Sequence, residues 1–496
     1  MRASVESVEH PGPMLIPALI GGSRVPAASG RTIEAVDPAT GKLLGQFPRC
    51  DAVDVDVAAN AAHRAAMQWR QVEAQERAEL LLQFAAAVER RGPELAHLDT
   101  QDNGSPLREM TRDVDIAVRQ LRYLAGLALE VKGASLPART GRLQLTVREP
   151  FGVVGRIIAF NHPLMFCATK LAAPLLAGNA VIMKPSEFTS LSALAMAEDL
   201  QRIFPPGVVS ILTGYGHEVG DALVHHAAVR RLAFIGSGST GRRIQARAAT
   251  SSALKTVTLE LGGKNPLVVF DDADLDQAVD GAVAGMNLTW QGQSCGSTSR
   301  LLVQRGVYEE VVRRVGERFA ALRTGSPFDP GNDSGALVNR AHLDKVLSYV
   351  EVGHAEGARL VAGGERLDDG VHADGNFVAP TLFADVDPGG RLATEEIFGP
   401  VLAATPFDDY EDAIALANGV DYGLTAAVYT QSLRTAMAFC RDVEAGYVWV
   451  NESSRHFAGL PYGGYKDSGV GRDEDISEIE SYTQVKAMTI NFGSWS

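Results

Sequence analysis

Cys295 stands in a setting where a thiol can react. In the segment "GQSCGS", glycine and serine replace the apolar neighbours expected around a structural cysteine. A reactive thiol needs such an open, polar place, because the thiolate is the nucleophile and nearby hydrogen-bond donors or a helix N-terminus stabilise it. A small buried hydrophobe is the alternative reading of any single cysteine, and it is the reading that we favour for Cys50, Cys167 and Cys440.

A second chemical pattern is the glycine-rich segment "FIGSGSTG", in which Gly236, Gly238 and Gly241 form a G-x-G-x-x-G sequence. A strand-like run precedes it and a helix-like run follows, which is the setting of a dinucleotide turn. Glycines let the backbone approach a pyrophosphate, and free N–H groups at the helix N-terminus stabilise its charge. A purely structural turn is the alternative. Glu260 in "LELGGKNP" lies at the distance of a ribose-binding acid, about 20 residues on.

Other polar residues indicate no metal site. His225 and His226 are adjacent, which places their side chains on different faces of a regular element and favours the surface over metal binding. The four cysteines show no C-x-x-C spacing, so we expect neither a zinc site nor a disulfide framework, and a reducing compartment is the default. Lys264 follows Glu260 closely, and we assign it no role.

The elements that must position these residues change character along the chain. Residues 51–69, 73–91 and 108–131 have apolar residues at helical spacing and predict a helical block. From about Leu143, short β-rich runs alternate with helical stretches in two successive series. This alternation predicts α/β domains with doubly wound parallel sheets.

Composition limits the class of protein. The 496 residues are 46% hydrophobic and 21% charged, which is typical of a globular chain with two or three domains. The net charge of −14 argues against a nucleic-acid or anionic-membrane partner. The N-terminal residues do not have the pattern of a signal peptide, and no apolar run reaches the roughly 20 residues of a membrane span. We therefore expect a cytoplasmic protein.

Taken together, the motifs resemble those of the aldehyde dehydrogenase superfamily. "AFNHP", "KPSEFT", "FIGSGSTG", "LELGGKNP", "GQSCGS", "EEIFGPV", "GYVWVN" and "PYGGYKDSGVGR" follow that family's order and approximate spacing. The resemblance implies an NAD-binding domain (1–131 and 151–262), a catalytic domain (263–460) and a small β oligomerisation arm with a C-terminal tail (132–150 and 461–496). A homodimer or homotetramer is expected, because exposed strand edges in such an arm invite pairing.

The resemblance also changes the interpretation of the glycine turn. The family's phosphate-side sequence is G-S-x-x-x-G, which is matched here by Gly236, Ser237 and Gly241, so that Gly238 completes the longer fingerprint by chance. The adenosine-ribose role falls to Lys184 and Glu187. A carboxylate at Glu187 accepts hydrogen bonds from ribose hydroxyls and repels a 2'-phosphate, which favours NAD over NADP as the cofactor.

The family assigns catalytic roles to matching residues. Cys295 resembles the nucleophile, and the Asn161 amide resembles the donor to the oxyanion. Glu396 and Phe398 resemble the residues that position the nicotinamide. Glu260 resembles the general base that activates water to hydrolyse the thioester. This role replaces the interpretation of Glu260 as the ribose-binding acid. The implied reaction is oxidation of an aldehyde to a carboxylic acid.

Departures from the commonest pattern concern the substrate. His162 stands where the family usually has an aromatic residue, and Thr169 replaces another aromatic residue of the substrate tunnel. Phe166 and Trp290 lie nearby by motif position. These exchanges predict a wider tunnel with more hydrogen-bonding capacity, and hence a bulky aromatic or functionalised aldehyde.

A distal loop carries two further substrate candidates. Arg455 and His456 fall in the loop that contacts the far end of substrates in this family, where they could bind a carboxylate or hydroxyl. A solvated loop is the alternative for both residues.

Three other functions compete with hydrolytic aldehyde oxidation as interpretations of these residues. A coenzyme-A-acylating relative generally lacks the acid found here at Glu260, and a non-catalytic member would show damage at Cys295, Asn161 or Glu260. All three residues are intact. A thiol-dependent esterase would need the same cysteine without NAD.

Overall fold

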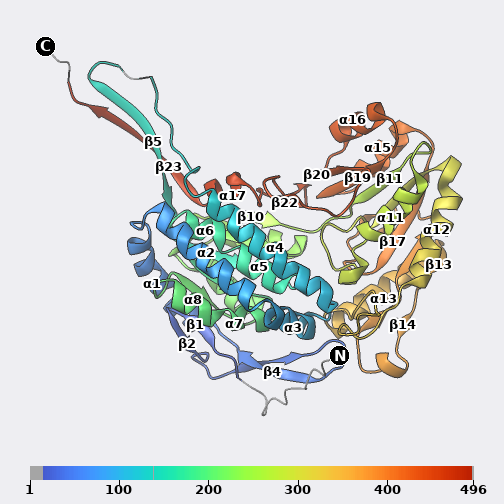
Figure 1. The fold of residues 1–496 in the computed structure, drawn as a ribbon, viewed down its shortest axis with the longest axis horizontal. Coiled ribbons are helices and arrows are strands. Elements are labelled where there is room, and N and C mark those ends of the chain that lie inside the picture. The colour runs from blue at the N-terminus through green and yellow to red at the C-terminus, as the bar shows by residue number, and fades with distance from the viewer. Residues whose placement is uncertain (1–14, 138, 494–496) are drawn as a thin grey trace, which may run out of the picture.

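Two lobes and a projecting ribbon make up the molecule (Figure 1). The computed structural model describes residues 15–137 and 139–493, so the N-terminal segment on which the signal-peptide prediction depends lies outside the described residues. Each lobe is built on a mostly parallel sheet, which confirms the predicted α/β class with two doubly wound domains and a small β arm.

The first lobe contains an eight-stranded sheet. Its strand order is β2 (Ser23–Val25), β1 (Ala18–Ile20), β8 (Val209–Ile211), β7 (Ala180–Lys184), β6 (Val153–Ile157), β9 (Val229–Ile235), β10 (Thr256–Glu260) and β22 (Gly469–Val470). The strands from β8 to β10 are parallel, and antiparallel strands close both edges. The strand β22 comes from the far end of the chain and pairs directly with the end of β10, where Glu260 lies.

Helices surround this sheet. They are α1 (Ala52–Trp69), α2 (Ala74–Arg90), α3 (Gly92–Asn103), α4 (Leu107–Gly126), α5 (Pro163–Thr169), α6 (Ala172–Leu176), α7 (Leu191–Ala195), α8 (Ala197–Ile203), α9 (Asp221–His225), α10 (Gly238–Ala249) and a short π-helical turn, η1 (Gly216–Gly220). A capping box fixes the start of α1. The Asp51 side chain accepts a hydrogen bond from a backbone N–H of the first helical turn, and the Asp51 backbone N–H donates to the Asp54 side chain. The helix predicted over 108–131 ends at Gly126, and α3 forms a separate element that the sequence patterns did not reveal.

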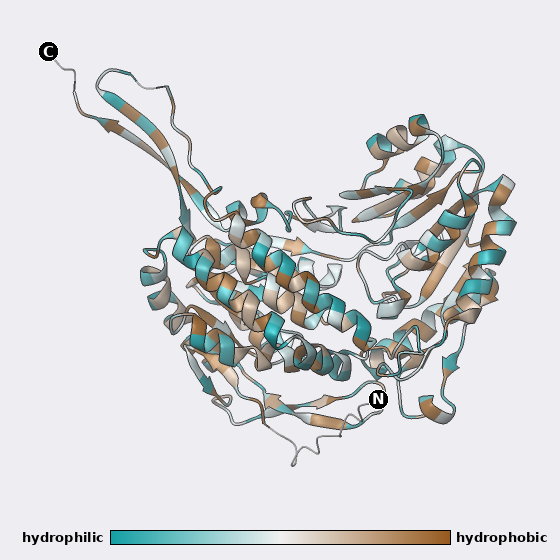
Figure 2. Ribbon diagram, in the orientation of Figure 1, coloured by the Kyte–Doolittle hydropathy of each residue, from teal (hydrophilic) through white to brown (hydrophobic). Residues whose placement is uncertain are grey.

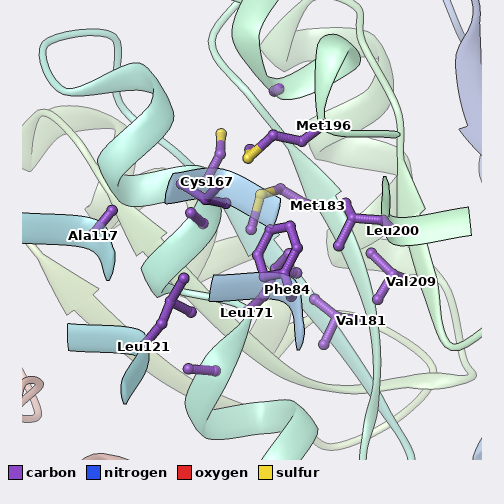
Figure 3. Close-up of a cluster of buried hydrophobic side chains, with 14 of the residues drawn as sticks. Phe84, Ala117, Leu121, Cys167, Leu171, Val181, Met183, Met196, Leu200 and Val209 are labelled. Atoms are coloured by element: carbon purple, nitrogen blue, oxygen red, sulfur yellow. The ribbon is translucent and has the colours of Figure 1, made fainter. Parts of the chain in front are cut away.

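Apolar faces of these helices form the core of the first lobe. Figure 2 shows teal and brown residues alternating around α2 and α4, which lie side by side. Their apolar faces join the buried cluster drawn in Figure 3, where Phe84 and Leu121 meet Leu171 and Val181. Cys167 lies within this cluster and is 0% exposed, so its environment is that of a core residue.

The second lobe is built on a seven-stranded sheet. Its order is β13 (Arg359–Ala362), β16 (Thr381–Ala384), β17 (Val401–Phe407), β12 (Arg300–Gln304), β11 (Pro266–Val269), β19 (Thr425–Tyr429) and β20 (Tyr447–Val450). All pairs except β13–β16 are parallel. Its helices are α11 (Leu275–Gly285), α12 (Tyr308–Ala321), α13 (Arg340–Ala355), α14 (Arg391–Thr394), α15 (Tyr410–Asn418) and α16 (Leu433–Asp442).

Smaller elements complete the fold. Two-stranded pairs are β3 (Thr32–Val36) with β4 (Leu43–Pro48), β14 (Arg366–Leu367) with β15 (Phe377–Val378), and β18 (Tyr422–Gly423) with β21 (Tyr465–Lys466). The remaining helical turns are η2 (Leu288–Trp290), η3 (Arg305–Val307), η4 (Gly370–His372) and α17 (Ile476–Ser481).

A long antiparallel ribbon projects from the first lobe (Figure 1). It consists of β5 (Arg142–Pro150) and β23 (Thr483–Asn491), paired in register along their whole length. These are the segments in which the sequence predicted an arm. Across the described parts of the chain, no helix is long and apolar enough to cross a membrane.

Candidate active site

The glycine turn joins the strand β9 to the helix α10. Ser237 is the N-cap of α10, and its hydroxyl accepts a hydrogen bond from the Thr240 N–H. A Cβ at Gly236 would lie 2.5 Å from the Phe234 ring, and one at Gly241 would lie 2.7 Å from the Leu261 side chain. A Cβ at Gly238 would meet nothing closer than 4.0 Å. Two of the three glycines are therefore required by packing, while the helix start at Gly238 borders open space.

Lys184 and Glu187 form an ion pair at the end of β7. The Lys184 Nζ lies 2.9 Å from Glu187 Oε2 and also donates to the Pro185 carbonyl. The lysine side chain is buried, whereas the glutamate side chain is 23% exposed. The buried lysine therefore holds the glutamate carboxylate at the surface of the first lobe.

Cys295 lies in a loop that is fixed from the second lobe. The Asn265 side chain donates to the Cys295 carbonyl at 2.7 Å and to the Ser297 carbonyl at 2.9 Å. Burial raises the pKa of the Cys295 thiol to about 12, and the negative charges of Glu260 and Glu396 act in the same direction. The protein alone therefore holds this sulfur mainly as the thiol.

Asn161 precedes the helix α5 and is 2% exposed. Within the described part of the chain its side-chain amide makes no hydrogen bond, and the amide atoms are not among the fully buried polar atoms that lack a partner. The neighbouring Phe160 carbonyl, by contrast, accepts from Asn103 and Thr189. An amide whose loop is fixed but whose own donors are free is suited to bind a ligand.

Glu260 lies in a buried cluster of charges. Its Oε1 is 3.4 Å from the Lys170 Nζ, and Lys170 is also 2.6 Å from Asp473 Oδ2. Burial and the neighbouring Asp473 raise the pKa of Glu260 well above its usual range, while Lys170 opposes this shift. Although burial acts against it, Lys170 and a hydrogen bond from Glu260 hold the pKa of Asp473 far below its usual range. The two carboxyl groups therefore titrate as a pair, in which the affinity for a proton is raised at Glu260 and lowered at Asp473.

Arg156 and Glu478 complete this cluster. The Arg156 guanidinium lies 3.4 Å from Asp473 and 3.2 Å from Glu478, and all three side chains are almost fully buried. Burial raises the pKa of Glu478 to about 7. Two cations and three carboxyl groups therefore share one mostly buried network.

Glu396 is bound by the segment that follows Glu260. The Gly263 N–H donates to Glu396 Oε1 at 3.0 Å. Phe398 adopts a left-handed φ of 62°, and its carbonyl accepts from His342 Nε2 at 2.7 Å. Its ring packs edge-on against Phe160, next to Asn161. Glu396 and Phe398 thus extend from the second lobe and contact residues of the first lobe.

His162 is anchored beside Asn161. Its Nδ1 lies 2.7 Å from Oδ2 of the buried Asp113, and its ring packs against Phe166 and Trp290 at 5.2 and 5.4 Å. In the described part of the chain, His162 Nε2 has no hydrogen-bond partner. Two of the predicted substrate residues, His162 and Phe166, therefore form one cluster with Trp290.

The other substrate candidates behave differently. The Thr169 hydroxyl donates to the Met165 carbonyl at 2.7 Å, and the residue is 3% exposed, so this hydroxyl adds no free hydrogen-bonding group to the site. Arg455 is 68% exposed and pairs with Glu452, which places it at the surface. His456 packs on Tyr462 at 4.5 Å and lies 3.4 Å from Glu474. Of the two candidates in this loop, His456 packs on Tyr462, which in turn contacts Cys295.

Sequence reasoning missed three residues of this site. Tyr462 Oη lies 3.7 Å from Cys295 Sγ. Lys170 forms an ion pair with Glu260, and Asp473 shares a hydrogen bond with Glu260. Tyr462 and Asp473 were within or directly beside the quoted motif "PYGGYKDSGVGR", so the motif was the available signal. In the described residues no group of three or more His, Cys, Asp or Glu side chains could hold a metal, and His225 and His226 bind Asp221 and Asp56 separately.

Comparisons with known proteins agree with this geometry. A family model described as "Aldehyde dehydrogenase family" matches residues 25–488. The chain belongs to the aldehyde dehydrogenase family. This match confirms the resemblance drawn from the sequence motifs.

Individual relatives cover almost the whole aldehyde dehydrogenase chain. "Aldehyde dehydrogenase tropH" of Talaromyces stipitatus is 44% identical over 467 residues, which are 93% of this chain and 90% of the relative. The NAD+ complex of aldehyde dehydrogenase from Bacillus cereus has a TM-score of 0.93 at 38% identity, with 97% of each chain covered. A mutant of P. syringae AldA indole-3-acetaldehyde dehydrogenase, in complex with NAD+ and IAA, gives 0.93 at 38% identity, with 96% of each chain covered.

Proposed function

We propose that this aldehyde dehydrogenase oxidises an aldehyde to the carboxylic acid with NAD, through a covalent intermediate on Cys295. The observation that carries the proposal is the link between Cys295 and Glu260. Tyr462 contacts the Cys295 sulfur, its backbone forms a two-way bridge with Asp473, and Asp473 shares a hydrogen bond with Glu260. A nucleophile and a candidate base from different lobes are thereby held in one assembly.

Each chain residue has a stated task in this reaction. Cys295 adds to the aldehyde carbon, and the free amide of Asn161 donates to the oxyanion that forms. Loss of hydride from the Cys295 adduct forms the thioester, and a bound NAD would supply the hydride acceptor. Glu260 then removes a proton from water, which attacks the thioester and releases the acid. Because burial and Asp473 raise the pKa of Glu260, a proton held there must pass to a neighbouring group or to solvent before Glu260 acts as the base.

The residues present fit NAD as the cofactor. The open start of α10 suits the pyrophosphate, Lys184 and Glu187 suit the adenosine ribose, and Glu396 and Phe398 would position the nicotinamide side. The Bacillus cereus and P. syringae relatives were solved with NAD+ bound. The carboxylate of Glu187 disfavours a 2'-phosphate, so we expect the ratio of kcat/KM for NADP to that for NAD to rise about tenfold in Glu187→Gln. An unchanged ratio would remove Glu187 from cofactor selection.

The substrate in this proposal is a bulky aromatic or functionalised aldehyde. His162, Phe166 and Trp290 offer ring faces beside Asn161, and aromatic rings pack well against one another. Asp113 fixes the His162 ring and leaves Nε2 for a polar group of the substrate. The P. syringae relative is an indole-3-acetaldehyde dehydrogenase, and its name supports an aromatic substrate for the present chain.

A panel of aldehydes tests the proposal. NADH formation at 340 nm is followed with aromatic, hydroxy-aromatic, carboxylated and short unbranched aldehydes, with Cys295→Ala as the control. We expect turnover that depends on Cys295 and is greatest for aromatic or polar-substituted aldehydes. Turnover confined to short unbranched aldehydes would contradict the substrate class, and turnover that persists in Cys295→Ala would contradict the mechanism.

We also propose that the chain forms a homo-oligomer through the ribbon of β5 and β23. Val485 and Ile490 on β23 are 61% and 41% exposed, and Leu143 on β5 is 36% exposed. Apolar side chains and open strand edges on a projecting ribbon are suited to pairing with another copy. Light scattering after size exclusion distinguishes dimer, tetramer and monomer, and a monomer would contradict the proposal.

A further inference from the structure

Tyr462 is a buried phenol aimed at the reactive sulfur. It is 5% exposed, and its Oη lies 3.7 Å from Cys295 Sγ, which is within hydrogen-bond range for sulfur. A Cβ at the neighbouring Gly296 would lie 3.3 Å from the same hydroxyl, so the absence of a side chain there leaves room for it. In the described part of the chain this sulfur is the hydroxyl's hydrogen-bond partner.

The position of Tyr462 is fixed on both sides. Its backbone N–H donates to the Asp473 carbonyl and the Asp473 N–H donates back, each at 2.9 Å. Its ring packs on His456 at 4.5 Å and on Tyr447 at 5.9 Å. A phenol held in this way loses little freedom when it donates a hydrogen bond, so the bond is preorganised.

We propose that Tyr462 is a catalytic donor, whose hydroxyl hydrogen-bonds to the sulfur of Cys295 and stabilises the thiolate that attacks the aldehyde. The direction of donation follows from acidity. Burial and the nearby Cys295 raise the pKa of Tyr462 well above its usual range, so the phenol keeps its proton when the sulfur has lost its own. The same hydrogen bond lowers the pKa of Cys295 against the effect of burial. The inference rests on the proposed role of Cys295 as the nucleophile.

Alkylation of the thiol tests this donor without NAD or aldehyde. Iodoacetamide reacts with the thiolate, the sulfur displaces iodide, and mass spectrometry of the Cys295 peptide measures the rate. The assay uses the full chain in a Cys440→Ser background, because Cys440 is exposed while Cys50 and Cys167 are buried. Charge-assisted hydrogen bonds imply that Tyr462→Phe reacts about 10- to 100-fold more slowly at neutral pH, with its rise in rate moved to higher pH.

Tyr447→Phe is the matched control. Tyr447 is 7% exposed and packs on the same ring cluster, but it forms no hydrogen bond to Cys295 in the described residues. Its loss should leave the alkylation profile unchanged. An equal effect in both variants, or an unchanged or faster rate in Tyr462→Phe, would overturn the proposal. Thermal unfolding and NAD binding show whether each variant is folded.

A second substitution keeps the ring and strengthens the donor. Replacement of Tyr462 by 3-fluorotyrosine makes the hydroxyl more acidic, so alkylation at neutral pH should become faster than in the parent chain. No change, or a slower reaction, would contradict the donor role. If the aldehyde panel shows no turnover while these alkylation results hold, the proposed function fails and the hydrogen bond to the thiolate stands.

Discussion

Cys295 and Glu260 are both half-buried, and the proposed reaction needs both in charged form, yet their surroundings differ. The Cys295 sulfur makes one side-chain hydrogen bond within the described residues, to Tyr462. Glu260 instead shares its cluster with Lys170, Arg156 and two further carboxyl groups. Burial raises the pKa of both groups.

This difference separates two ways of activating a half-buried group. Activation of the Cys295 thiol depends on one side-chain donor, Tyr462, and on the charges of bound cofactor and substrate, so few residues of the chain control it. The carboxyl group belongs to a network that can accept its proton, so its activation depends on several residues at once. Substitutions near Cys295 should therefore change rates at one step, whereas substitutions near Glu260 should also change the dependence on pH.

Glu260→Gln should have the largest effect in this comparison. Loss of the base leaves the thioester unhydrolysed, so steady-state turnover falls about 10²- to 10⁴-fold. The steps before hydrolysis need no carboxylate at this position, and a rapid burst of one NADH per active site should remain in stopped-flow absorbance. Unchanged steady-state turnover would take Glu260 out of the mechanism. Glu478→Gln, in the same cluster but paired with Arg156, should lose less activity.

Asn161→Ala should have the next largest effect, and it tests the thiol side. Loss of an oxyanion donor lowers kcat about 10²- to 10³-fold, and the burst itself should slow. Asn161→Asp is the matched variant, because it keeps the size of the side chain and removes the N–H donors. Equal losses in both variants with unchanged NAD affinity would sharpen the comparison. A full-rate burst in either variant would break it.

Lys170→Met should have the smallest effect at high pH and a clear effect at low pH. Lys170 lowers the pKa of Glu260, so its loss raises that pKa further and more of the base stays protonated. The rise of kcat with pH should therefore move to higher pH, with about a tenfold loss on the rising limb and recovery above it. A profile that moves to lower pH, or not at all, would show that the network does not set the state of Glu260.

Much of the fold followed from local sequence patterns. The alternation of β-rich and helical segments predicted the two α/β sheets, because strand and helix periodicities are local properties. The strand β22 could not be found in this way, since Gly469 pairs with Glu260 across the whole second lobe of the chain. The end of α4 at Gly126 was also missed, because the residues that follow continue to have helix-forming composition.

The site was predictable to the extent that motifs carry it. Cys295, Glu260 and Asn161 lie within motifs of the family, and the structure adds the free amide of Asn161. Tyr462 and Lys170 were missed because their importance lies in contacts between distant segments, which no local pattern encodes. Thr169 shows the opposite limit, since its polar type predicted a free hydroxyl that the helix backbone in fact binds.

The most direct test of the account is to trap the covalent intermediate. Glu260→Gln is mixed with NAD and an aromatic aldehyde, quenched in acid during the burst, digested and analysed by mass spectrometry. The account predicts the acyl mass on the peptide that contains Cys295, in proportion to the NADH formed. NADH without an acyl group on that peptide, or an acyl group on a different residue, would contradict it.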